Sequence, residues 1–500
     1  MSIARTAAHG VAWNMLFGIS SRMLTLVGTL VLTRFIAPHD YGAVLAASIS
    51  TTTLGVFSSF GFGQYLIARK ASPPVAFQAA QIHFMLGVVA MAVLVTFRGP
   101  MGDLLDTPEM GPYVTWYALA HLIDRARYVP ERLLMRDLRF RAIATINGTG
   151  EIVFAVIALS LAPSLGADAV VIAVLIRAGF TAVLYFACQP RATWLVYAPL
   201  QAEVVRGLFG YGLPLTIGAI ADRAATRWDS LIVSKLFGPG VMARYNLSYS
   251  LAEMPVSHVA EHIGEVLMPS FSRMEDAQRR AAVVRAAAAM AVVVSPLGVG
   301  LAAIAPTVVD AFFDARWAGM APMLQILSVM TVFRPMFWSG SAYLQAVQQT
   351  RLIMIMSCTR AVLVLPLVAG LGHAGGPEWA CVGACIGYAV HSIASIVVTG
   401  YATRLPIVGY LIGVMRPLLA CVPMFIAVTA VRAGLAELDV PSVASLVAEI
   451  VVGAVVYIVS ALVLVRSTSR ELIRLGKDAL RRRPARAAAA VSADPSDARS

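Results

Sequence analysis

Charged residues are scarce in this chain. Only 13% of its 500 residues are Asp, Glu, Lys or Arg, and 59% are hydrophobic, whereas soluble domains contain about 25% charged residues. The mean hydropathy of +0.76 also argues against a soluble globular protein. The composition therefore predicts an integral membrane protein.

Cysteine is also sparse, and the chain lacks a recognisable signal peptide. Cys381 and Cys385 lie one helical turn apart without His or acidic companions, so we interpret them as core packing and expect no metal site. The first apolar run is longer than the core of a signal peptide and has no Ala-x-Ala-like exit, so we expect no cleavable signal. The five cysteines all fall inside or at the ends of apolar runs: Cys188, Cys358, Cys381, Cys385 and Cys421.

The chain contains fourteen apolar stretches, the first at Val11–Ile36 and the last at Val443–Val465. Each has about the 20 residues that a helix needs to cross a bilayer. The fourth, Pro112–Val129, is the weakest because His121 and Asp124 lie inside it. The connections are too short for a soluble domain. We therefore predict an all-α integral membrane protein with about 14 transmembrane helices.

Positive charges are distributed unevenly over the predicted loops. Loops on the side of the N-terminus hold groups of cations, such as the six Arg within residues 125–141 and the eight cations within residues 466–486, whereas the opposite loops hold single ones. Because Lys and Arg stay on the cytoplasmic side during insertion, both termini are expected to be cytoplasmic. This distribution accounts for the net charge of +12 without a nucleic-acid partner.

The chain contains an internal repeat. Residues 30–38 read Leu-Val-Leu-Thr-Arg-Phe-Ile-Ala-Pro and residues 231–239 read Leu-Ile-Val-Ser-Lys-Leu-Phe-Gly-Pro, so all nine positions correspond in chemical type. Such repeats in a membrane chain indicate two bundles that flank a central site. Further pairs keep nearly the same spacing, with three residues inserted after the proline: Arg22 with Arg223, Tyr41 with Tyr245, and Arg69 with Arg273.

Several stretches resemble one known family. The segments Thr33-Arg-Phe-Ile-Ala-Pro-His-Asp-Tyr-Gly42 and Gly61-Phe-Gly-Gln-Tyr-Leu-Ile-Ala-Arg-Lys70 resemble the first-hairpin signatures of polysaccharide biosynthesis transporters, the Wzx-like oligosaccharide flippases. The basic segment Glu131–Arg141 resembles that family's loop between helices four and five, and Ser21-Arg22-Met-Leu24 is similar to a Ser-Arg-x-Leu pattern in the related lipid II flippases.

The resemblance implies the fold of the multidrug/oligosaccharidyl-lipid/polysaccharide (MOP) exporter superfamily. That fold has two pseudo-symmetric six-helix lobes around a central cavity, followed by two further helices. On this chain the lobes are expected at residues 1–200 and 201–405, and the last two helices at residues 406–466. Residues 467–500 form a basic tail without apolar periodicity, predicted to be disordered. Its Arg481–Arg483 cluster is either a contact with anionic lipid or an inside-retention signal.

The resemblance also implies a function. The chain would be a transporter and not an enzyme, moving undecaprenyl-diphosphate-linked oligosaccharide repeat units across the bacterial inner membrane by alternating access. The repeat units would serve exopolysaccharide, capsule or O-antigen assembly. An ion gradient or the membrane potential would supply the energy without a cofactor, and the sequence has no Gly-x-x-x-x-Gly-Lys-Ser/Thr phosphate loop. Membrane lipid is an expected partner, and a polysaccharide polymerase and its co-polymerase are candidate partners.

Two other functions stay open at this stage. A cation-coupled multidrug antiporter of the same superfamily would usually have twelve helices and a cavity rich in acids and aromatics, and not one led by Arg. A membrane polysaccharide polymerase or ligase would carry a large outer loop with catalytic Arg or His. No predicted outer loop exceeds about twenty residues, which argues against the enzyme.

Arginines inside the apolar stretches are candidate ligands of the diphosphate. A charge near the midplane costs at least ~2.5–3.5 kcal/mol, so it normally faces a cavity or a partner, and the paired N–H donors of Arg suit a diphosphate. Arg227 follows Arg223 by one turn on the same predicted face. The alternative is that Asp222 and Asp229 neutralise these two cations as structural pairs. The candidates are Arg22, Arg223, Arg227 and Arg334.

Three other charged residues in the apolar stretches are interpreted without a role in substrate binding. Arg360 is only about three turns from the cytoplasmic edge of its stretch, so we expect its side chain to extend to the interface. Arg177 and Glu151 are expected to pair with each other.

The eighth stretch holds an unusual cluster of His and Glu. His258, Glu261 and His262 share one helical face and match a His-x-x-Glu-His zinc-protease pattern, but the pattern lies in a membrane span and lacks an obvious third ligand. Titratable groups of this kind could instead couple transport to protons or cations, or form a polar wall. The candidates for ion coupling are Asp222, Asp229, Glu253, His258, Glu261 and His262.

Overall fold

The computed structural model describes residues 28–69, 71–272, 274–347, 349–438, 440–466, 468–471 and 474. Every regular element in these ranges is a helix, which confirms the prediction of an all-α protein. Nine helices of the described part are long and apolar enough to cross a membrane, and the bent pair Ala202–Leu213 and Leu215–Phe237 gives a tenth. The chain is a multi-pass membrane protein, and the count of fourteen spans stays a prediction.

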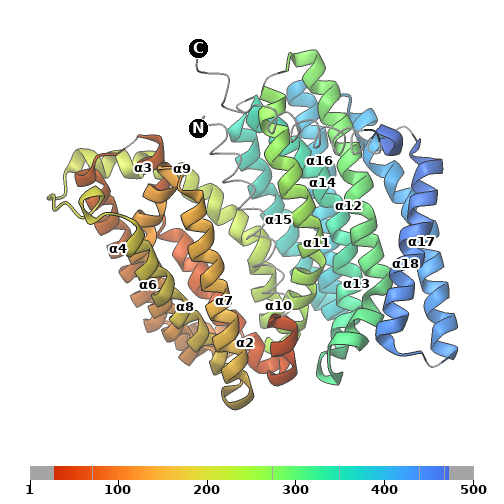
Figure 1. The fold of residues 1–500 in the computed structure, drawn as a ribbon, viewed down its shortest axis with the longest axis horizontal. Coiled ribbons are helices and arrows are strands. Elements are labelled where there is room, and N and C mark those ends of the chain that lie inside the picture. The colour runs from red at the N-terminus through yellow and green to blue at the C-terminus, as the bar shows by residue number, and fades with distance from the viewer. Residues whose placement is uncertain are drawn as a thin grey trace, which may run out of the picture. The chain divides into compact units, whose positions relative to one another are not determined.

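Two compact units make up the described chain. Unit 1 contains residues within Met1–Ser250, Phe312–Leu327 and Met354–Tyr388, and unit 2 contains residues within Leu251–Ala311, Ser328–Ile353 and Ala389–Ser500. The predicted lobe boundaries at residues 200 and 405 stay predictions. The helices, shown in Figure 1, are α2 (Pro38–Phe57), α3 (Phe62–Ala68), α4 (Pro73–Thr96), α5 (Arg98–Leu104), α6 (Met110–Arg136), α7 (Phe140–Leu165), α8 (Asp168–Cys188), α9 (Ala202–Arg223), α10 (Asp229–Phe237), α11 (Pro239–Ser272), α12 (Asp276–Phe312), α13 (Ala321–Met330), α14 (Arg334–Ala346), α15 (Thr350–Gly375), α16 (Pro377–Thr403), α17 (Ile407–Glu437) and α18 (Ser442–Leu464).

Prolines set the starts of two equivalent helices. Residues 28–35 are helical and Pro38 then begins α2, just as α10 ends at Phe237 and Pro239 begins α11. Proline suits the first helical turn because its missing N–H would have no partner there in any case. The helix–proline–helix arrangement therefore occurs at both copies of the repeat, as the sequence pattern predicts.

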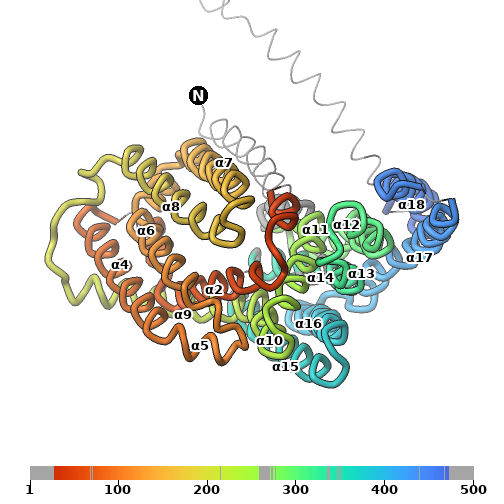
Figure 2. Tube along the Cα trace, turned by 90° about the horizontal axis from the view of Figure 1, so that it is seen from below, coloured from red at the N-terminus to blue at the C-terminus, as the bar shows by residue number. Residues whose placement is uncertain are grey.

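In unit 1, α2, α4, α6, α7 and α8 form a bundle, and α7 and α8 lie side by side in both views (Figures 1 and 2). Its core near α3 contains Phe62, Leu66, Ile82 and Leu133, all buried. These apolar contacts fix the helices whose polar side chains form the cavity described below.

The seventh predicted span is broken twice. A bend of 41° separates Ala202–Leu213 from Leu215–Phe237, with Pro214 between them, and proline has no backbone N–H to donate to a helix. Further along, residues Ala224–Trp228 form a π-helical turn, η2, between α9 and α10. Such turns often occur at functional sites, and this one contains Arg227.

In unit 2, hydrogen bonds to α12 hold α17 and α18 in place. Thr307 Oγ1 donates to Glu449 Oε1 at 2.8 Å and the Tyr457 hydroxyl donates to the Val292 carbonyl at 2.6 Å. On α17, Arg432 donates to the Ala303 carbonyl at 2.7 Å. Because lipid offers no hydrogen-bonding groups, each bond satisfies a polar group that would otherwise be costly at this depth.

Candidate functional site

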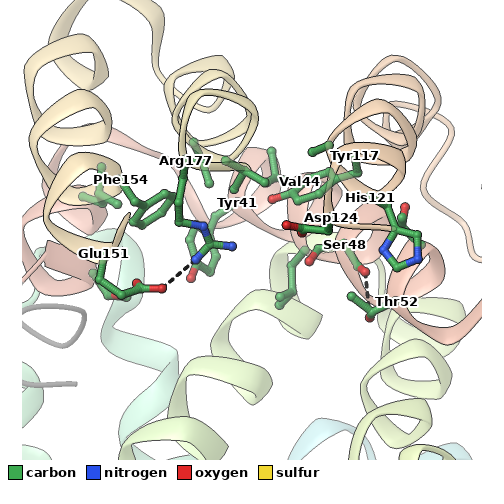
Figure 3. Close-up of a pocket in the computed structure, with 17 residues that line it drawn as sticks. Tyr41, Val44, Ser48, Thr52, Tyr117, His121, Asp124, Glu151, Phe154 and Arg177 are labelled. Atoms are coloured by element: carbon green, nitrogen blue, oxygen red, sulfur yellow. Dashed lines mark hydrogen bonds and ion pairs between the residues drawn. The ribbon is translucent and has the colours of Figure 1, made fainter. Parts of the chain in front are cut away.

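A polar cavity of about 330 Å³ lies within the helix bundle of unit 1. Residues 28–35 and helices α2, α6, α7 and α8 line it, and Figure 3 shows its side chains. Its volume falls at the lower end of the range of about 300–1,000 Å³ that is typical of small-molecule pockets. The cavity can therefore hold a small ligand or one part of a larger one.

One face of α2 supplies most of the hydroxyl groups of this cavity. Tyr41, Ser48, Thr51 and Thr52 all line it, and their spacing of three, four or seven residues places them on one side of a helix. Thr51 and Thr52 also donate to backbone carbonyls of the preceding turn, at 2.8 and 2.9 Å, so their hydroxyls need no side-chain partner. Hydroxyls remain available to accept hydrogen bonds from a ligand.

Charged side chains face the hydroxyls from the other helices. Arg177 of α8 donates to Glu151 of α7 at 2.8 Å (Figure 3), which confirms the predicted pair. On α6, Asp124 accepts from Arg127 at 2.7 Å, and Arg127 also contacts Glu131 at 2.9 Å. The charges at the wall are therefore mostly compensated.

This combination of groups suits a polyhydroxylated ligand. Hydroxyls, carboxylates and a guanidinium can exchange hydrogen bonds with sugar hydroxyls, while Tyr41, Tyr117 and Phe154 offer aromatic surface. Among the described residues, no group of three or more His, Cys, Asp or Glu could hold a metal ion.

A charge exchange distinguishes a structural role of the Arg177–Glu151 pair from a ligand-binding one. We expect Arg177→Glu to lower the transport that the family resemblance implies, because it places two carboxylates together at the cavity wall. If the pair only holds α7 to α8, the double variant Arg177→Glu with Glu151→Arg restores activity. If the double variant stays inactive, Arg177 contacts the ligand. Arg98→Glu, at an exposed arginine hydrogen-bonded to Thr115, is the matched control. Transport is measured at equal amounts of each variant in the membrane.

Arg223 and Arg227 both lie next to the break in the seventh span. Arg223 ends α9 and Arg227 lies in η2, and both are half-buried. Among the described residues, neither guanidinium forms an ion pair or hydrogen bond with another side chain. The two cations interact electrostatically with each other, Arg223 also interacts with Asp222, and Arg227 interacts with Tyr41 at the cavity. The Trp228 indole donates to Thr53 of α2 at 3.3 Å, which holds η2 beside that helix.

The predicted carboxylate partners of these cations have other contacts. Asp222 pairs with Arg360 of α15 at 2.5 Å. The expectation that Arg360 extends to the interface is wrong, because its side chain is buried and donates to the exposed carboxylate of Asp222. Asp229 is fully buried and accepts from the Tyr245 hydroxyl and the Ser230 amide, each at 2.8 Å.

Two other predicted site residues, Arg334 and Glu253, meet in unit 2. Arg334 of α14 forms an ion pair with Glu253 of α11, and its guanidinium lies 5.9 Å from the centre of the Trp338 ring. A candidate substrate ligand and a candidate coupling group are therefore direct partners of each other.

The other predicted site residues lie outside the part of the chain that the structure describes. Arg22 lies outside the described residues, as does almost all of the basic tail. His258, Glu261 and His262 fall within the helix α11, but their side chains lie outside the described part.

Contacts between the two copies of the repeat form what we call the repeat junction, within unit 1. A Cβ atom on Gly42 would overlap the carbonyl of Pro239. The Thr107 and Ser234 hydroxyls hydrogen-bond at 2.9 Å in a buried position. The turn before α13 completes the junction: Arg316 donates to the Arg34 carbonyl at 2.9 Å, and the Trp317 indole donates to the Thr33 carbonyl at 3.0 Å.

These last two bonds satisfy carbonyls at the end of helical residues 28–35, which otherwise lack intrahelical partners. The distribution of Lys and Arg predicts that this end of the protein faces outside.

The cavity residues on α2 were not predicted as a site. Their signal is the recurrence of Tyr41, Ser48 and Thr52 at helical spacing within an apolar stretch. His121 and Asp124 stood out as polar groups in the fourth stretch, and both line the cavity.

Comparison with known proteins gives consistent matches. Residues 31–322 match the family model described as polysaccharide biosynthesis protein. The succinoglycan biosynthesis transport protein ExoT of Rhizobium meliloti (strain 1021) is 26% identical, covering 98% of this chain and 99% of its own length. The lipopolysaccharide biosynthesis protein WzxC of Escherichia coli (strain K12) is 21% identical, and the match covers 85% of this chain and 87% of WzxC.

A solved structure shares the fold. The lipid II flippase MurJ, in an inward closed conformation, matches with a TM-score of 0.75 at 13% identity, over 92% of this chain and 99% of MurJ. This likeness supports the predicted membrane-transporter fold. Since the family model matches more than half of the sequence, the chain belongs to the polysaccharide biosynthesis protein family.

Proposed function

We propose that this protein is a flippase that moves an undecaprenyl-diphosphate-linked oligosaccharide across the bacterial inner membrane for exopolysaccharide, capsule or O-antigen assembly. The observation that best supports this function is the match over nearly the whole length of the chain to ExoT, which is named as a succinoglycan biosynthesis transport protein. The polar cavity of unit 1, walled by membrane helices, supplies a place for the sugar. The protein acts as a transporter and not as an enzyme.

The cations at the broken span are suited to the diphosphate. Within the described part of the chain, the structure shows no ion pair or side-chain hydrogen bond for Arg223 or Arg227, although Asp222 acts electrostatically on Arg223. Their N–H donors can therefore turn to a phosphate. Arg22, as the repeat equivalent of Arg223, supplies a third cation in this proposal. The sugar then occupies the hydroxyl-lined cavity beside Tyr41, which lies within electrostatic reach of Arg227.

Alternating access requires an outer end that opens and closes. The repeat junction supports this step, because it joins the two copies of the repeat at the predicted outer end through one close glycine contact and the hydrogen bonds of Ser234 and Trp317. An ion gradient or the membrane potential drives the cycle without a cofactor. Both termini are cytoplasmic in this proposal, and a polymerase with its co-polymerase receives the exported units.

Deletion of the gene tests the function directly. We expect the deletion strain to lose surface polysaccharide and to accumulate lipid-linked repeat units on the cytoplasmic side, and the wild-type gene to restore both. Strains are compared by quantifying polymer and extracted lipid-linked sugars. Unchanged polymer together with higher sensitivity to cationic drugs would contradict the flippase and support a multidrug antiporter of the same superfamily.

A further inference from the structure

A buried arginine behind the cavity wall contacts two histidines. Arg125 of α6 donates from Nε to His121 Nε2 at 2.9 Å and from Nη1 to His83 Nε2 of α4 at 2.9 Å. Its third contact is the Gly55 carbonyl of α2. Both Arg125 and His83 are buried. One guanidinium therefore ties three helices together, and among the described residues no carboxylate contacts it.

The surroundings of this cluster are mostly apolar or aromatic. The His83 ring stacks on Tyr128 at 4.0 Å and meets the edge of Phe62 at 6.1 Å. The charged or titratable groups that face the cluster are Asp124, Tyr128 and Arg132, all on α6. From α2 and α3, within the described residues, only backbone and uncharged side chains face it.

The contacts require both imidazoles to be uncharged. Guanidinium has donors only, so each histidine accepts with a ring nitrogen that holds no proton. A proton on that nitrogen removes the acceptor and places two cations within hydrogen-bond distance. The guanidinium occupies the space between the two imidazoles and carries a positive charge, and both of these exclude a metal ion. The ligand that this cluster can take up is a proton.

Proton uptake would change the packing of a cavity wall. His121 lines the cavity on one side and binds Arg125 on the other. A Cβ atom on Gly55 would lie 2.5 Å from His121 Cε1, so the ring rests directly on the α2 backbone. If the ring turns away from Arg125, α2 loses its ring contact with α6 and can shift the hydroxyls that face the ligand.

We propose that His83, His121 and Arg125 form a proton-binding site that couples protonation to the packing of α2 against α6. Its use in transport rests on the proposed flippase function: the imidazoles take up a proton from the more acidic outer side and release it inside. The cluster itself is a property of the structure and can be tested without a substrate.

The test uses the full-length protein in lipid nanodiscs with 15N-labelled histidine, titrated from pH 8 to pH 3. The chain has eight histidines, so His83→Gln and His121→Asn assign the two signals. We expect Arg125→Gln to raise the proton affinity of both imidazoles about tenfold, because it removes an adjacent positive charge. Arg125→Lys, which keeps the charge, leaves them closer to the wild type. The exposed His373 serves as the internal control.

Two results would overturn the proposal. One is that the His83 and His121 signals do not respond to Arg125→Gln. The other is that the deletion strain, restored by the wild-type gene, is restored equally by His83→Gln and His121→Asn at external pH 6 and pH 8. If the wild-type gene does not restore export in the deletion strain, the flippase function is rejected. The nanodisc titration then still tests the proton-binding site.

Discussion

Replacing Gly42 by Leu is expected to abolish polysaccharide export while the protein still inserts in the membrane. At this position even a Cβ atom would overlap the Pro239 carbonyl and lie 2.9 Å from the Pro239 Cβ. These neighbours belong to the backbone and ring at the start of α11, so they cannot rotate away. A Leu side chain holds the two copies of the repeat apart, and a transporter that cannot close one end cannot complete its cycle.

The measurement is surface polymer in the deletion strain, normalised to the amount of protein in the membrane. Gly42→Ala should give a smaller loss than Gly42→Leu, since it adds one methyl group. Gly370→Leu is the control, because Gly370 lies on α15, is exposed, and has no atom within 4 Å of an added Cβ. Export at the wild-type level with Gly42→Leu would mean that the junction does not need to close.

Replacement of Arg223 and Arg227 by Ala is expected to have the second largest effect. Each charge-assisted hydrogen bond to a phosphate contributes about 1.5–3 kcal/mol, so the loss of one cation should lower the export rate about tenfold to hundredfold. The double variant should approach the deletion strain. Lysine variants keep the charge but not the paired N–H donors, and should restore export only in part.

Arg191→Ala is the control for these variants, because Arg191 is an exposed arginine in a short 3-10 turn. Lipid-linked repeat units should accumulate inside the cell in the Arg223 and Arg227 variants and not in the control. Full export in the Arg223→Ala, Arg227→Ala double variant would remove these residues from the substrate path.

The sequence predicted those features that depend on local pattern. Apolar length predicted membrane helices, and the two Leu-to-Pro segments predicted an internal repeat, at whose two copies Pro38 and Pro239 begin helices in the structure. Arg177 and Glu151 were predicted as a pair because both interrupt neighbouring apolar stretches, and they meet at 2.8 Å.

Contacts between distant helices could not be predicted in this way. Asp222 and Arg360 are 138 residues apart, and their pairing depends on how each helix is rotated about its axis. The π-helical turn at Ala224–Trp228 adds to this difficulty, because it replaces the α-helical spacing from which Arg223 and Arg227 were assigned to one face. The local sequence does not predict that this turn is π-helical, with a wider turn than an α-helix has.

The repeat junction also has a consequence for biogenesis. Trp317 lies 284 residues after Thr33, whose carbonyl it binds, and Arg316 lies 282 residues after Arg34. A ribosome adds about 5–20 residues per second, so the first hairpin waits roughly 15–60 s for these partners. Until then its terminal carbonyls must be covered by water or by the insertion machinery. Assembly of this end of the protein is therefore a late event, paced by translation of the second half of the chain.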